Sequence, residues 1–316
     1  MPERYSAARR ELRILLFRTG LPMKRILLFI ITNLAVLLVL TIVARLLGLD
    51  TWLAVHGQSF GGLLVWAALF GFGGAFISLA MSKMQAKMFM GVQVIGDSPD
   101  PTEQWLLAVV ERHARAVGVG MPEVGIFDSP APNAFATGAS RNSALVAVST
   151  GLLQRMNREE IEAVLGHEMT HVANGDMVTL TLIQGIVNTF VLFLARVVGN
   201  IVDRAVFRSE DGRGIASYLT FYVLQIVFGL LATPLVMWFS RQREFRADRG
   251  GAQLAGTGNM IAALEDLKRG SEPLPAQQFA AFGITDAAAV SGLKRLFMSH
   301  PPLDERIAAL RALGTH

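Results

Sequence analysis

The chain has 316 residues, enough for one sizeable catalytic domain and several apolar segments but hardly for two independent globular domains. A mean hydropathy of +0.43, with 52% hydrophobic and only 17% charged residues, excludes an ordinary soluble protein, in which about 25% of residues are charged. The net charge of +4 does not indicate nucleic-acid binding, because the basic residues lie beside apolar runs. The absence of cysteine excludes disulfides, thiolate nucleophiles and sulfur-ligated metal sites.

The chain begins with a basic, partly amphipathic segment, residues 1–25, which is typical of a segment lying on a membrane surface. The apolar run at 26–43 follows it and approaches the length of about 20 residues that a membrane-spanning helix needs. A removable signal peptide is the alternative interpretation. No small-residue cleavage site follows the run, so a membrane anchor is favoured.

A second apolar run, at 60–81, is rich in glycine and alanine and is followed at once by Lys83 and Lys87. The connector 48–59 contains no lysine or arginine. Because positive charge concentrates on the cytoplasmic side of membrane proteins, this asymmetry predicts a transmembrane hairpin over 26–82. The chain after Lys83 is then cytoplasmic.

Residues 83–176 have mixed composition and predict the first half of a soluble domain. Asp100, followed by Pro101 and Glu103, has the pattern of a helix start, and Gly118 that of its end. Three short β-like runs separated by turn residues predict a small sheet: 123–127, 134–137 and 144–148.

A second pair of apolar segments is expected within residues 177–239, with the second half of the soluble domain at 240–316. The apolar pair contains polar residues, including Gln184 and Asn188, and also Pro234. It could therefore form two spans, a re-entrant hairpin or buried helices of the domain. The length of the runs favours two spans.

His167, Glu168 and His171 form an H-E-x-x-H motif. Histidines at i and i+4 of a helix lie about 40° apart around its axis, so both rings can reach one metal ion. The glutamate between them can take a proton from an attacking water, whose pKa a zinc ion lowers to about 7. Asn157 as a helix cap and Gly175 as a stop predict the required helix independently. The alternative is a buried helix with two core histidines and an unrelated glutamate, because the motif is short.

A hydrolytic zinc site needs a third protein ligand, and Glu244 is the candidate. Asp248 lies one helical turn later and could orient a ligand histidine through its second ring nitrogen. Two membrane crossings separate His171 from Glu244, which returns both to the same side. Without that context the two carboxylates would be a solvated acidic pair among arginines.

Four segments carry a resemblance to a known family: Asn133–Gly138, Gly166–His171, Arg243–Asp248, and Ser299–Pro302 followed by Arg306. In these motifs and their order the chain resembles the HtpX family of bacterial membrane zinc metalloproteases, within the wider group that includes the prenyl-protein CAAX endopeptidase. The resemblance covers nearly the full length. The N-terminal basic segment is longer than is usual in that family, which leaves its role open.

The resemblance implies one zinc ion per chain, with His167, His171 and Glu244 as ligands and Glu168 as the general base. It implies that Asp248 orients a ligand. Two further groups follow from the resemblance. His300 and Arg306 match positions that help to stabilise the transition state. The family's substrate-binding edge strand, which pairs with an extended peptide by β-augmentation, corresponds here to Asn133, Ala134, Phe135 and Ala136.

The implied fold is mainly α with a small β-sheet: an integral membrane protein with transmembrane helices and a cytoplasmic zincin-like metallopeptidase domain. The implied activity is hydrolysis of misfolded or damaged membrane proteins at the bacterial inner membrane, under heat or envelope stress, with unfolded or membrane proteins and the lipid bilayer as partners. Two alternatives stay open, a membrane transporter or channel and a non-catalytic membrane metal-binding protein. The remaining histidines, His56, His113 and His316, are in no ligand-like pattern and are interpreted as structural or solvated.

Overall fold

The computed structural model describes residues 41–42, 45–46, 48–55, 59–206, 215–270 and 296–313. The chain divides into two compact units, residues 1–66 and 67–316. In the first unit, α2 covers Leu49–Val55. The predicted basic segment and nearly all of the first predicted span lie outside the described residues.

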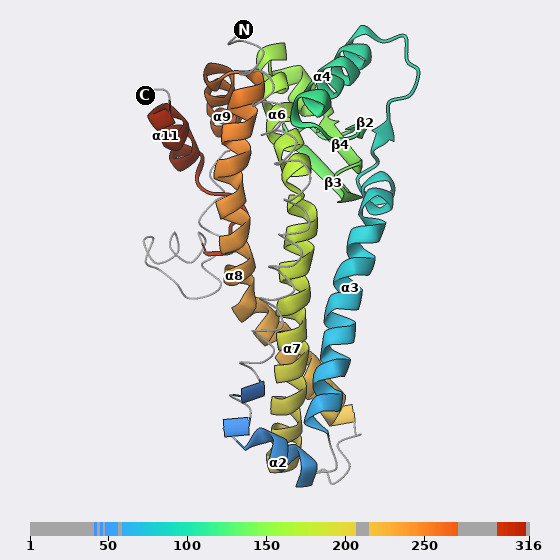
Figure 1. Cartoon of the computed structure of the whole chain (residues 1–316), viewed down its shortest axis with the longest axis vertical. Helices are drawn as coiled ribbons and strands as arrows, with labels where there is room; N and C mark the ends of the chain where they lie inside the picture. The colour runs from blue at the N-terminus through green and yellow to red at the C-terminus, as the bar shows by residue number, and fades with distance from the viewer. Residues whose placement is uncertain are drawn as a thin grey trace, which may run out of the picture. The chain divides into compact units, whose positions relative to one another are not determined.

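The second unit is mostly helical, with one small sheet (Figure 1). Helix α3, which begins in the first unit, covers Phe60–Phe89. The elements that follow in chain order are β1 (Gln93–Val94), α4 (Pro101–Val117), β2 (Glu123–Phe127), β3 (Ala134–Ser140), β4 (Ser143–Ser149), α5 (Thr150–Arg155), α6 (Arg158–Asn174), α7 (Asp176–Val206), α8 (Ile215–Ala255), α9 (Thr257–Gly270) and α11 (Leu303–Leu313).

The helix boundaries predicted from local signals are confirmed. Asp100 accepts hydrogen bonds from the backbone N–H groups of Thr102 and Glu103 and so begins α4. Asn157 begins α6 with a capping box. Both helices end at a left-handed glycine, Gly118 at φ 69° and Gly175 at φ 65°.

The sheet has the strand order β1-β2-β4-β3, with a parallel pair between β2 and β4 and antiparallel pairs elsewhere. The three predicted β-like runs correspond to β2, β3 and β4. Strand β4 is buried and central, whereas β3 forms one edge of the sheet. Near its end β3 has a register irregularity between Thr137 and Ser140, where Gly138 adopts φ 139°.

The core of the second unit surrounds α6. Its buried residues come from α4, the sheet, α5, α6, α8, α9 and α11, and they include Leu106, Val146, Leu165, Leu264 and Leu310. Every one of these five side chains is at most 1% exposed. Helix α6 is therefore fixed from several sides, which a rigid metal site requires.

Three of the described helices, α3, α7 and α8, are long and apolar enough to cross a membrane. Helices α7 and α8 lie side by side (Figure 1). The outward face of α8 exposes large apolar side chains such as Leu219, Ile226, Leu230 and Leu231, as expected where the surroundings are lipid. Glycines allow α3 and α7 to approach closely, since a Cβ at Gly71 would lie 2.6 Å from the backbone nitrogen of Thr189.

The second apolar pair consists of two long helices, and α8 extends beyond the predicted apolar run. The expected boundary at residue 240 falls inside α8, which continues without a break to Ala255 although it contains Pro234. One helix thus carries both the exposed apolar side chains and Glu244.

Candidate metal centre and active site

Helix α6 presents His167 and His171 on one face. The two Nε2 atoms lie 3.2 Å apart, and the rings meet nearly edge to face at 86°. His167 is 6% exposed. The helical spacing of the motif therefore produces the paired arrangement that the sequence predicts.

Glycines let α8 approach α6 closely enough to add a third group. A Cβ at Gly251 would lie 3.0 Å from the backbone nitrogen of His167, and a Cβ at Gly166 would lie 3.2 Å from the Cα of Gly251. Glu244 lies two helical turns before this contact and is 2% exposed. The backbone contact thus places a carboxylate of α8 over the histidines of α6.

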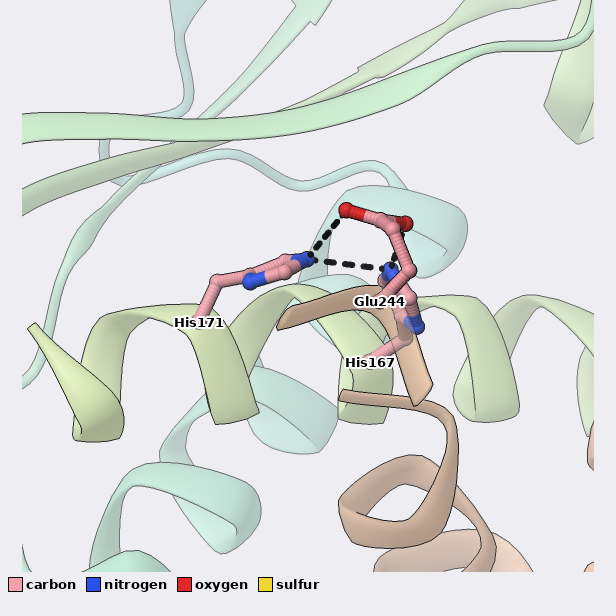
Figure 2. Close-up of side chains that lie close together, drawn as sticks. All are labelled: His167, His171 and Glu244. Atoms are coloured by element: carbon pink, nitrogen blue, oxygen red, sulfur yellow. Dashed lines mark hydrogen bonds and ion pairs between the residues drawn. The ribbon is translucent and has the colours of Figure 1, made fainter. Parts of the chain in front are cut away.

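The three side chains converge on one point (Figure 2). The Glu244 carboxylate oxygens lie 3.4 Å from Nε2 of His167 and 3.4 Å from Nε2 of His171. Two ligand atoms at about 2.0–2.1 Å from a tetrahedral zinc ion lie about 3.3–3.4 Å from each other. The observed separations match the edges of such a tetrahedron.

Carboxylates also contact the far side of both rings. Nδ1 of His167 lies 2.9 Å from Asp248, and Nδ1 of His171 lies 2.7 Å from Asp176. If each Nδ1–H donates to its carboxylate, both Nε2 atoms are left as acceptors facing Glu244, and these three acceptors need a cation or protons between them. The donor set therefore fits a divalent metal.

The carboxylates around the two histidines favour protonation of the rings for the same reason. Burial alone would lower the pKa of His171, but the carboxylates of Asp176 and Glu244 outweigh it and raise that pKa to about 10. Burial likewise opposes protonation of His167, and hydrogen bonds with Asp248 and Glu244 raise its pKa above the ordinary value. Protons and a divalent metal ion would therefore compete for the same three side chains.

Glu168 is half-buried beside the histidines. Its negative charge helps to raise the pKa of His171. Its position differs from that of Glu244, because it follows His167 on α6 and is not among the converging ligand atoms.

His300 and Arg306 reach the centre from the C-terminal segment. Nδ1 of the largely exposed His300 lies 2.8 Å from Glu244. Arg306 is buried and donates from Nε to Asp248 at 2.8 Å, with Nη2 contacting the other carboxylate oxygen. Its Nη1 lies 3.8 Å from Glu244, so the guanidinium is chiefly engaged with Asp248.

The predicted substrate-binding strand, β3, lies against α6, the helix that carries His167 and His171. Strand β3 contacts α6, and strand ribbons pass in Figure 2 on the side of α6 from which the histidines project. Asn133 precedes the strand and is held by Ser149, whose Oγ accepts its N–H at 2.9 Å. Ala134 and Ala136 pack on the main core, and Phe135 packs on Phe127.

Two contributors to the site, Asp176 and Arg243, were given no role from the sequence, although Arg243 is the first residue of the Arg243–Asp248 motif. Asp176 is the first residue of α7, and Arg243 directly precedes Glu244. A carboxylate beside an apolar run is costly unless it has a partner, and this was the available signal for Asp176. Local spacing gave no signal for Arg243, because its contact depends on how α8 packs.

Comparisons with known proteins agree with this geometry. The profile described as Peptidase family M48 matches residues 100–314. Protease HtpX of Thioalkalivibrio sulfidiphilus is 62% identical over 295 residues, covering 92% of this chain and 99% of the relative. Protease HtpX of Xanthomonas euvesicatoria is 60% identical over 291 residues, covering 91% of this chain and 97% of the relative.

The fold also resembles a solved structure. The crystal structure of Ste24p from S. mikatae superimposes with a TM-score of 0.57 at 20% sequence identity, covering 90% of this chain and 67% of that one. The likeness concerns the fold alone. With the family profile, the relatives, the apolar helices and the cluster of metal-binding groups together, the chain belongs to peptidase family M48 and is a membrane-bound zinc metalloprotease.

Proposed function

We propose that the protein is an endopeptidase that cleaves misfolded or damaged membrane proteins on the cytoplasmic side of the bacterial inner membrane. The observation that carries the proposal is the convergence of His167, His171 and Glu244 within 4.8 Å of one another, beside a glutamate and an edge strand. The names of the relatives support the protease activity.

In this proposal the zinc ligands are His167, His171 and Glu244. Bound zinc supplies Lewis acidity, which polarises the scissile carbonyl and lowers the pKa of the attacking water. Glu168 accepts a proton from that water and passes it to the leaving amine. Asp248 holds the ring of His167 in place.

His300 and Arg306 are proposed to stabilise the charge that develops on the carbonyl oxygen of the transition state. His300 supports this because its side chain is 59% exposed and can turn toward a substrate. Arg306 acts partly through Asp248, with which it is paired, and partly through its positive charge near Glu244.

The substrate is proposed to bind as an additional strand on β3, along Asn133, Ala134, Phe135 and Ala136. An edge strand offers main-chain hydrogen bonds to an extended chain without demanding a particular sequence. Such recognition suits unfolded polypeptides, since only an unfolded segment can extend beside the strand.

The test compares Glu168→Gln with the parent in detergent. The variant should retain about one zinc per chain, measured by metal analysis, and lose cleavage of casein. Glu159→Gln makes the same chemical change at an exposed position of the same helix and should cleave as the parent does. Glu244→Ala should lose both zinc and cleavage.

Cleavage by Glu168→Gln at the rate of the parent would show that another group is the base. Full zinc occupancy in Glu244→Ala would remove Glu244 from the ligand set.

A further inference from the structure

Each of the two histidines has its own carboxylate behind it. Asp248 faces Nδ1 of His167, and Asp176 faces Nδ1 of His171 at 2.7 Å. The side chain of Asp176 is 2% exposed, so water competes little for this hydrogen bond.

The chain direction at Asp176 explains how it reaches the ring. Helix α6 ends at Gly175, whose φ of 65° lies in the left-handed region, and α7 begins at the next residue. The left-handed turn brings the side chain of Asp176 back to the ring of His171, five residues earlier. Asp176 also begins α7, where a negative charge is favourable.

Arg243 holds the backbone at this point. Its Nη1 donates to the main-chain carbonyl of Asp176 at 3.1 Å, and its Nη2 donates to Ser240 at 3.1 Å. Arg243 is 7% exposed and directly precedes Glu244. A side chain next to one ligand thereby fixes the residue that contacts another ligand.

We infer that Asp176 is a positioning residue for His171 and that Arg243 acts through it. Asp176 accepts the Nδ1–H of His171, which directs Nε2 to the metal and prevents the ring from turning. Arg243 keeps the Asp176 carbonyl, and hence the first turn of α7, at a fixed place relative to Glu244. The inference rests on the proposed function, because it takes His171 and Glu244 as ligands.

A purely structural role would give a different result. If Asp176 only joined α6 to α7, its loss would lower thermal stability, and the folded molecules would bind zinc as tightly as before. Zinc affinity and the geometry of the bound metal therefore separate the two roles.

The experiment uses the full chain in detergent and the variant Asp176→Asn, which keeps the size of the side chain and removes its charge. Zinc affinity is measured by competition with a chromophoric chelator. The dissociation constant is expected to rise about 10- to 100-fold, the usual effect of losing such a partner. The visible absorption of the cobalt-loaded protein is expected to change as well, because the ligand ring is no longer fixed.

The matched control is Asp203→Asn. Asp203 is the other buried aspartate of α7, also 2% exposed, and accepts a hydrogen bond from Ser217 instead of a site residue. It lies about 40 Å from Asp176 along the helix, at 1.5 Å per residue. This control should keep the parental zinc affinity.

A double-mutant cycle tests the part of Arg243. Arg243→Gln should weaken zinc binding, and Asp176→Asn with Arg243→Gln should weaken it no more than Asp176→Asn alone. Independent, multiplying losses would overturn the action of Arg243 through Asp176. Arg243→Gln also keeps the inference testable if Asp176→Asn does not fold, because unchanged zinc affinity in it would then overturn the link.

Unchanged zinc affinity and an unchanged cobalt spectrum in Asp176→Asn would overturn the inference, as would an equal loss in Asp203→Asn. Absence of zinc binding by the parent would instead refute the proposed function. The two failures are therefore distinguishable.

Discussion

The close contact between α6 and α8 makes a quantitative prediction for Gly250→Ala. A Cβ at Gly250 would lie 2.8 Å from Cβ of Thr170 and closer still to its Oγ1 and Cγ2. Thr170 cannot easily turn away, because its β-branched side chain is stiff and its Oγ1 donates to the carbonyl of Gly166 at 2.8 Å. One of the two helices must then move.

The magnitude follows from two opposing effects. Alanine in place of glycine inside a helix contributes about 1 kcal/mol of helix propensity. Overpacking of a close contact costs about 1–3 kcal/mol. Gly250→Ala should therefore lower the unfolding free energy by up to about 2 kcal/mol, and it should also weaken zinc binding because Glu244 moves away from His167 with α8.

The assay combines unfolding in mixed micelles with zinc competition. Gly229→Ala provides the control, since Gly229 belongs to the same helix and a Cβ there meets nothing within 4 Å. It should be neutral or stabilising and should bind zinc as the parent does. If Gly250→Ala proved as stable as Gly229→Ala, with parental zinc affinity, the close helix contact would not be what sets the site.

Two further predictions concern pH and topology. His113 is 1% exposed, its Nε2 contacts the carbonyl oxygen of Glu162, and burial lowers its pKa below the ordinary 6.5. Protonation therefore favours the unfolded state, so the stability that neutral His113 provides is present above pH 6.5 and is lost as the pH falls through the folded-state pKa. His113→Leu should reduce this pH dependence of the melting temperature, measured by thermal unfolding at a series of pH values. Because the chain contains no cysteine, single cysteines can report the membrane orientation. Gly96→Cys should resist a membrane-impermeant maleimide in intact cells and Val206→Cys should react, whereas the reverse pattern would contradict the proposed cytoplasmic location of the active site.

Much of the region around the candidate metal centre could be predicted from short sequence patterns. The caps Asp100 and Asn157 and the stops Gly118 and Gly175 act within a few residues, so their sequence patterns identify the helix ends directly. The pairing of His167 with His171 was predictable for the same reason, because it depends only on helical spacing.

Contacts between segments that are distant in the sequence could not be predicted in this way. The approach of Gly250 to Thr170 depends on how two helices cross, and no periodic pattern encodes it. The burial of His113 depends on the packing of α4 on α6. The continuity of α8 through residue 240 was missed because the apolar run ends there, although helical hydrogen bonding does not require apolar side chains.

Because α8 is continuous, a small change in its tilt displaces side chains far along the helix. Glu244 lies ten residues beyond Pro234, or about 15 Å at 1.5 Å per residue. A swing of about 2° around the proline would shift the carboxylate by about 0.5 Å, a distance comparable to the tolerance of a preorganised site. Any change in the inclination of this helix would therefore move a proposed zinc ligand.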